Sequence, residues 1–168
     1  MARQSGQSGS TEGGLLGPPV RRGPSLKSQA IALLARREHS RLELQRKLQS
    51  RAESPEDIPP LLDELEQQGL LSNERFAQSL VHRRAAGRGV RQVAQELRQH
   101  GLLPELIESV HESLSATEPE RAQAAWEKKF GARPSSQKEY ARQARFLASR
   151  GFSTQTIQRL LGDIPRMG

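Results

Sequence analysis

The chain contains no cysteine and few aromatic residues, and both shortages narrow what it can be. Without cysteine there is no disulfide, no thiolate metal site and no cysteine nucleophile, so a reducing, cytoplasmic location is expected. Aromatic residues make up 4% of the chain, which is thin for a protein that stacks on nucleic-acid bases. No apolar run approaches the roughly 18 to 20 residues that span a bilayer, and none resembles a signal peptide. A soluble cytoplasmic protein is therefore expected.

Strand-forming residues are also scarce. The 168 residues include only five Ile and five Val, whereas Leu, Gln, Glu, Arg and Ala dominate. Leu, Ile, Val and Phe together number 36, which is little material for one large core in a highly charged chain. The composition therefore predicts an all-α protein without a single spherical core.

Apolar residues recur at three- and four-residue spacing in nine short segments, the pattern of helices with one buried face. Several segments begin with a residue that can cap a helix. Ser40 is predicted to cap the second helix, with Glu43 completing a capping box. Ser54 or Asp57 opens the third helix, and Ser72 or Asn73 the fourth. The remaining expected starts lie at Pro104, Thr117, Ser136 and Ser153.

The nine segments form three cycles with a constant register. Equivalent leucines are followed, ten residues later, by equivalent isoleucines, and each set recurs after 49 or 50 residues: Leu48, Leu97 and Leu147, then Ile58, Ile107 and Ile157. A period near 50 with three helices per unit is typical of tandem repeats that bury their apolar faces partly against neighbours. The sequence predicts an elongated, curved array of three three-helix repeats, at residues 26–71, 72–116 and 117–168, after a disordered Gly/Pro/Ser-rich tail at residues 1–25.

Two glycines, Gly87 and Gly89, interrupt the second repeat and are predicted to form a hinge between its first two helices. Gly101 follows the next helix, where a residue that accepts positive φ lets a helix stop. Gly87-Arg-Gly89 is not a phosphate loop, because no strand precedes it and no Gly-Lys-Ser/Thr follows.

Charge is distributed unevenly along the chain. The net charge is +7, with −1 on residues 26–71 and +5 on residues 117–168, which favours an anionic partner met by one end. Arginines also recur around the first helix break of repeats 1 and 2. We call this set the basic stripe: Arg36, Arg37, Arg83, Arg84, Arg88 and Arg91. Guanidinium groups bind carboxylates and phosphates in pairs of hydrogen bonds, so the stripe could bind an acidic protein or DNA.

The sequence gives little indication of a catalytic site or a metal site. The four histidines, at positions 39, 82, 100 and 111, lack the paired spacing of a zinc site and are assigned structural or solvent roles. Trp126 and Phe130 are expected in the core, while Tyr140 and Phe146 could stack on a base. No arrangement of nucleophile and base can be argued, so we expect no enzyme, no cofactor and no metal.

Three stretches together resemble the RecX regulators of the bacterial recombinase RecA. They are residues 33–48 (LLARREHSRLELQRKL), residues 69–77 (GLLSNERFA) leading to Arg84 and residues 87–89 (GRG), and residues 128–130 (KKF) with 145–153 (RFLASRGFS). The resemblance covers about residues 26–163. Where the family often has Asp, this chain has Asn73, and either residue can cap a helix.

The resemblance implies a crescent of three three-helix repeats that lies in the groove of the RecA–DNA filament and inhibits its ATP hydrolysis and strand exchange. Such a protein would regulate homologous recombination and DNA repair as a monomer, meeting DNA directly or through the filament. The alternative is a helical-repeat protein whose basic face binds nucleic acid without the recombinase.

Overall fold

The computed structural model describes residues 23–166, and within them every regular element is helical. The predicted disordered tail, residues 1–25, lies outside the described residues except for its last three. Repeat 1 comprises α1 (Leu26–Arg36), α2 (Arg41–Gln49) and α3 (Ile58–Gln67), with a short 3₁₀ helix, η1 (Pro55–Asp57), before α3. Repeat 2 comprises α4 (Asn73–Arg84), α5 (Val90–Gln99) and α6 (Pro104–Ser115). Repeat 3 comprises α7 (Glu118–Lys129), α8 (Gln137–Ser149) and α9 (Thr154–Leu161).

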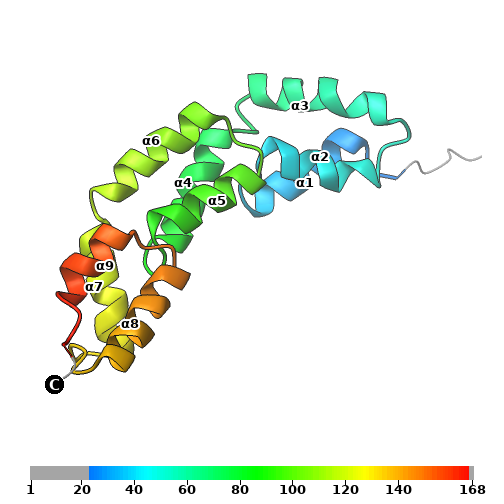
Figure 1. Ribbon diagram of the computed structural model, residues 1–168. Coiled ribbons are helices and arrows are strands. Elements are labelled where there is room, and N and C mark those ends of the chain that lie inside the picture. The colour runs from blue at the N-terminus through cyan, green and yellow to red at the C-terminus, as the bar shows by residue number, and fades with distance from the viewer. Residues whose placement is uncertain (1–22, 167–168) are drawn as a thin grey trace, which may run out of the picture.

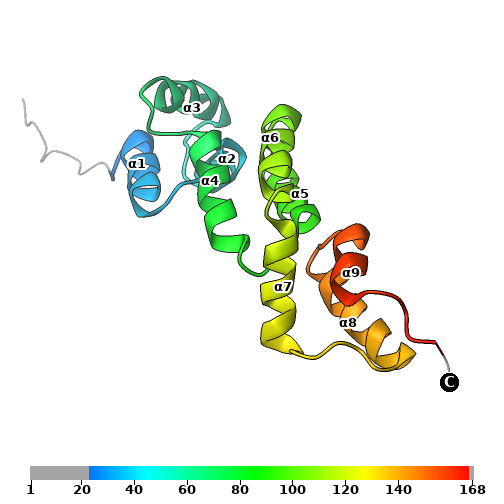
Figure 2. The ribbon, with the colours of Figure 1, turned by 90° about the vertical axis from the view of Figure 1, so that its left-hand side faces the viewer.

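The three repeats follow one another in a bent, elongated row (Figure 1). In this view α3, α6 and α9 lie along the outer side of the bend, whereas α5 and α8 lie toward its inner side. A view turned by 90° shows the same succession, with repeat 1 at one end and α8 and α9 at the other (Figure 2). The elongated, curved array predicted from the sequence is confirmed.

Each repeat has its own small core. One cluster of buried side chains lies in repeat 1, a second in repeat 2 and a third in repeat 3. The predicted register is confirmed at the centre of each cluster. Leu48, Leu97 and Leu147 are completely buried, and the isoleucines that follow them, Ile58, Ile107 and Ile157, are at most 7% exposed. Burial of one such aliphatic side chain contributes about 1.5–3 kcal/mol.

Serine hydroxyls begin five of the helices. In each, the side-chain oxygen accepts the backbone N–H three residues on, which satisfies one of the free donors of the first turn. The five capping residues are Ser25, Ser40, Ser72, Ser136 and Ser153.

The predicted capping box is wrong, whereas the structure decides between the alternatives at the starts of α3 and α4, and Ser72 is confirmed as the cap of α4. The Glu43 carboxylate does not return to Ser40 as a capping box requires, because it binds Arg37 instead. Ser54 caps η1, and α3 starts after Asp57 with no bond from the Asp57 side chain. Asn73 does not cap α4, because Ser72 does; the Asn73 amide oxygen accepts the N–H of Arg41, 2.9 Å away, at the start of α2.

The two glycines before α5 do not act through left-handed backbone. Gly101 has a φ of 72° and ends α5 as predicted, but Gly87 and Gly89 are not among the glycines with positive φ. Gly89 is needed for space: a Cβ at this position would lie 2.2 Å from the carbonyl carbon and oxygen of Gly151 and 2.3 Å from the Phe152 nitrogen. The predicted hinge is therefore a close contact between repeats 2 and 3.

Candidate functional site

The six arginines of the basic stripe fall at two successive junctions between repeats. Arg36 and Arg37 end α1, next to the α1–α2 connection that contacts repeat 2. The other four surround the α4–α5 connection, which contacts repeat 3. Helix α4, of 12 residues, runs from the first junction to the second, a length of about 18 Å at 1.5 Å per residue. The stripe is therefore two basic groups along the array.

Two of the six arginines are engaged by carboxylates of the same repeat. Arg37 forms a bidentate ion pair with Glu43, and this hydrogen bonding raises the pKa of the Arg37 guanidinium. Arg84 Nη2 lies 3.2 Å from Glu96 Oε1. Arg36, Arg83 and Arg91 are exposed and have no carboxylate within ion-pair distance in residues 23–166.

A half-buried arginine of repeat 3 holds the connection that carries Arg88. The Arg121 guanidinium donates to the backbone carbonyls of Ala85, 3.1 Å away, and of Arg88, and also to that of Leu114, 2.8 Å away. Burial lowers the pKa of Arg121. One guanidinium group thus donates to three backbone carbonyls, and these bonds fix the backbone of the α4–α5 connection against α7.

A buried carboxylate of repeat 3 holds the start of α5 beside it. Glu118 is 6% exposed. Its Oε1 accepts the N–H of Val90 at 3.2 Å and of Ser153 at 3.3 Å, and its Oε2 accepts the Thr156 hydroxyl at 2.9 Å. Val90 and Thr154 are the first residues of α5 and α9, so the carboxylate lies at the positive ends of two helix dipoles. The backbone next to Arg91 is therefore fixed from the neighbouring repeat.

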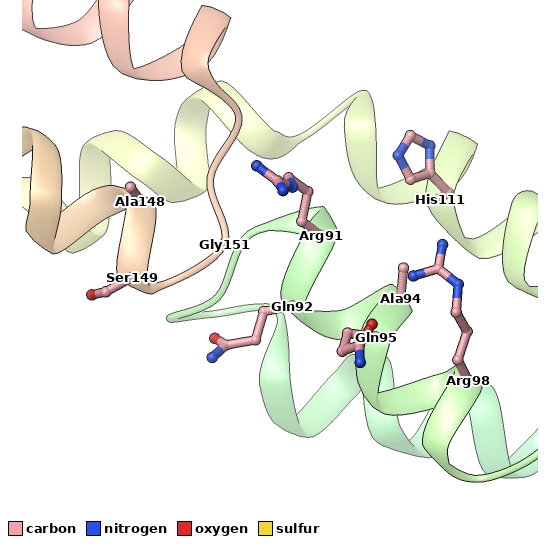
Figure 3. Close-up of a pocket in the computed structure, with 9 residues that line it drawn as sticks. All are labelled: Arg91, Gln92, Ala94, Gln95, Arg98, His111, Ala148, Ser149 and Gly151. Atoms are coloured by element: carbon pink, nitrogen blue, oxygen red, sulfur yellow. The ribbon is translucent and has the colours of Figure 1, made fainter.

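An open groove of 430 Å³ crosses the junction of repeats 2 and 3. Figure 3 shows Arg98 and His111 on one side, the end of α8 with Ala148, Ser149 and Gly151 on the other, and Arg91 between them. The glutamines Gln92 and Gln95 complete the polar lining, and the lining contains no carboxylate. Arg91 and Arg98 are exposed. Two free guanidinium groups and two amides can bind phosphate or carboxylate oxygens, and the groove has the charge for an anionic partner.

Further cations lie on repeat 3, and the basic stripe did not include them. All ion pairs of the described chain join residues between Lys27 and Glu96. On α8, Lys138, Arg142 and Arg145 are exposed, and the Arg142 guanidinium lies 5.5 Å from the ring centre of Phe130. The charge of +5 on residues 117–168 pointed to this end of the molecule. Lys138, Arg142 and Arg145 could have been selected from the sequence on that signal.

The histidines and aromatic residues have packing roles or lie at the surface. His39 is buried and donates through Nδ1 to the Arg37 carbonyl, 2.9 Å away; burial lowers its pKa. Trp126 is buried, and its Nε1 donates to Gln143 Oε1 at 2.7 Å. Phe146 is half-buried, packs edge-on against Phe130 and carries the Arg150 guanidinium 5.0 Å from its ring centre. The Phe146 ring is thus already engaged within repeat 3.

No group of three or more potential metal ligands comes together within residues 23–166. Nor does that part of the chain contain a helix with the length and apolar character that crossing a membrane requires.

Each repeat matches one domain of a single protein family. Residues 27–65 match the first three-helix domain of RecX, residues 72–110 the second and residues 116–161 the third. The chain belongs to the RecX family. The regulatory protein RecX of Ralstonia pickettii is 48% identical over 144 residues, covering 85% of this chain and 91% of the relative. That of Herbaspirillum seropedicae is 47% identical over 141 residues, 84% of this chain and 89% of the relative.

A crystal structure of RecX from Lactobacillus salivarius is similar in fold to this RecX-family chain. The two superpose with a TM-score of 0.69 over 80% of this chain and 91% of that chain, at 19% identity. The three-helix repeats and their succession are thus shared at low sequence identity. The RecX relatives are described as regulatory proteins, in keeping with the expectation of a regulator.

Proposed function

We propose that this protein binds the RecA–DNA filament and inhibits its ATP hydrolysis and strand exchange, and so regulates homologous recombination and DNA repair in the cytoplasm. The observation that carries the proposal is the match of all three repeats to the RecX family of regulatory proteins. The protein acts by binding and needs no cofactor or catalytic residue of its own.

The shape and charge of the molecule support binding to an extended anionic partner. Its small separate cores form a bent row about one repeat thick, which exposes a long surface for its size (Figure 1). On that surface the groove at the junction of repeats 2 and 3 carries Arg91 and Arg98 without a carboxylate in its lining. Truncating a charge that is desolvated at an interface typically costs about 2–5 kcal/mol of binding free energy.

The decisive experiment measures DNA-dependent ATP hydrolysis by RecA with and without this protein. The protein should lower the rate, and the variant Arg91→Glu with Arg98→Glu should inhibit less while keeping its thermal midpoint, because exposed charges contribute little to stability. Arg46→Glu with Arg51→Glu, an equal charge change in repeat 1, serves as the control. Unchanged hydrolysis with the wild-type protein would contradict the proposal.

Direct binding to DNA is the second candidate. The exposed cations of α8 favour it, since they form no ion pair within residues 23–166. It requires DNA binding by the purified protein in the absence of RecA. The logarithm of the binding constant should then fall linearly with the logarithm of the salt concentration, with a slope set by the number of phosphates contacted. Lys138→Gln with Arg142→Gln should reduce that slope. A slope unaffected by these changes would exclude the α8 face.

A further inference from the structure

The two junctions between repeats share one hydrogen-bond geometry. Asn73 is the first residue of α4, and its side chain accepts the N–H of Arg41, the first residue of α2, at 2.9 Å. Glu118 is the first residue of α7, and its side chain accepts the N–H of Val90, the first residue of α5, at 3.2 Å. The first helix of each following repeat therefore caps the second helix of the repeat before it.

A glycine contact is repeated in the same way. A Cβ at Gly101, which ends α5, would lie 2.8 Å from Leu42 Cδ2 in the first turn of α2. A Cβ at Gly151, which ends α8, would lie 2.6 Å from Gln92 Cβ in the first turn of α5. The two junctions thus have the same arrangement, with different residues in the shared positions.

The junction of repeats 2 and 3 adds bonds that the other junction lacks in the described structure. Arg121 donates across the junction to the carbonyls of Ala85 and Arg88. Glu118 is itself held in place within repeat 3 by bonds from Ser153 and Thr156. The backbone N–H of Gly89 donates to the Arg150 carbonyl at 2.7 Å. Hydrogen bonds to the buried Glu118 carboxylate and from the half-buried Arg121 guanidinium are charge-assisted, and such bonds are strong and directional, so they define one relative orientation of the two repeats.

The junction of repeats 1 and 2 depends on weaker polar contacts. Asn73 is neutral, and the ion pair that crosses the junction joins Arg75 to Glu38, whose side chains are 43% and 30% exposed. Exposed ion pairs are screened by water and salt and contribute between nothing and about 1 kcal/mol. This junction therefore resists a change of angle less than the other one does.

We propose that repeats 2 and 3 form one preformed body, in which Glu118 and Arg121 are positioning residues for Arg88, Arg91 and the groove between the repeats, while repeat 1 changes its angle at the junction carrying Asn73. The groove is then organised before any partner arrives, and repeat 1 adapts to the partner's curvature. The proposal goes beyond the proposed function and is tested on the free protein, so failure of one does not decide the other.

The absence of cysteine allows a direct test by paired spin labels. Exposed residues in α1, α4 and α8 provide one label site per repeat: Ala32→Cys, Gln78→Cys and Ala141→Cys. Pulsed electron paramagnetic resonance on the full chain should give a narrow distribution of distances between the labels on repeats 2 and 3. It should give a broad distribution between the labels on repeats 1 and 2. Equally narrow or equally broad distributions at both junctions would overturn the proposal.

A graded series at position 118 tests the positioning role. Glu118→Ala should broaden the distribution between repeats 2 and 3 and remove the hydrogen-exchange protection of the Val90 amide. Glu118→Gln, which keeps an oxygen for Val90 and Ser153, should restore the narrow distribution in part. Glu120→Ala, an exposed carboxylate in the same turn, is the control and should change neither measurement.

An unchanged narrow distribution in Glu118→Ala would overturn the role of Glu118. If Glu118→Ala does not fold, Arg121→Lys provides the second variant. It keeps the positive charge but loses the guanidinium group that donates to both Ala85 and Arg88, so it should broaden the distance distribution between repeats 2 and 3. A folded Arg121→Lys variant with the wild-type distribution would overturn the role of Arg121.

Discussion

Helices α2 and α5 occupy the same place in their repeats but begin in different ways. Helix α2 starts after Ser40, whose own hydroxyl accepts the N–H of Glu43 at 3.1 Å. Helix α5 starts after Gly89, which has no side chain to offer, and receives its cap from Glu118 in the next repeat. Helix α2 thus has a local cap from Ser40 as well as the cap from Asn73 in repeat 2, whereas α5 lacks a local side-chain cap. At position 89 the backbone of repeat 3 occupies the space where a side chain would lie. The start of α5 therefore depends on repeat 3 for its cap.

The largest effect is expected from Gly89→Ala. The added Cβ would overlap the Gly151 backbone, and backbone atoms cannot rotate away as a flexible side chain can. We expect a loss of about 3 kcal/mol or more in the free energy of unfolding, measured by denaturant melts. The matched control is Gly87→Ala, whose Cβ would meet only Arg150 Nη1 at 3.4 Å. Equal stability of the two variants would contradict the close contact.

The second effect is the loss of the distant cap in Glu118→Ala. This change leaves the N–H groups of Val90 and Ser153 and the hydroxyl of Thr156 without their acceptor in a buried site. A loss of about 2–3 kcal/mol is expected from denaturant melts, since hydrogen bonds to a buried charged group are costly to remove. A loss under about half a kcal/mol would show that water replaces the carboxylate there.

Each of the two caps of α2, the local one from Ser40 and the one from Asn73 in repeat 2, should matter less. Ser40→Ala and Asn73→Ala each remove one acceptor from the first turn of α2, and each should lower the free energy of unfolding by about 1 kcal/mol. Asn73→Asp keeps an oxygen acceptor and should retain most of the stability. If Asn73→Ala costs as much as Glu118→Ala in the same melts, the two junctions are equally strong and the comparison fails.

The smallest expected effect is the contribution of His39, which precedes Ser40, to the pH dependence of the free energy of unfolding. Burial lowers the pKa of His39 below its ordinary 6.5, so the neutral ring is favoured in the folded state. Protonation then favours the unfolded state: the stabilisation is complete above about pH 6.5 and is lost as the pH falls below that value toward the folded pKa. Wild-type melts should lose more stability than His39→Gln melts between about pH 7.5 and pH 5.5, by less than about 1 kcal/mol.

For the pH comparison, the control is His82→Gln, which removes an exposed histidine instead of a buried one. Identical pH dependence of the wild-type protein and His39→Gln would contradict a role for His39.

The sequence correctly predicted the features that are determined by residues close together in the chain, namely the repeat register and several serine caps. The repeat register appeared at Leu48, Leu97 and Leu147 because apolar periodicity is set within each helix, and all three side chains are buried. Serine caps such as Ser136 were found for the same reason: the acceptor and its donor are three residues apart.

Features that depend on distant residues were missed or misread. Gly89 looked like a flexible hinge because its neighbour in space, Gly151, lies in another repeat. A glutamate in the first turn of a helix is ordinarily exposed, so nothing marked Glu118 as a buried acceptor. Of the candidate site, the groove contains only Arg91 of the six predicted arginines. Its other arginine, Arg98, was visible as a charge on α5, but its place in a groove that the end of α8 also lines was not.

The separation between Val90 and its cap has a consequence for synthesis on the ribosome. The donor emerges 28 residues before its acceptor, Glu118, whereas the cap of α2 by Ser40 is available as soon as that helix emerges. During vectorial synthesis, repeat 1 can therefore complete its core early, while α5 remains frayed at its start until α7 has left the exit tunnel. A nascent chain stalled before Glu118 would expose the first turn of α5 to proteases, and extension through repeat 3 would protect it.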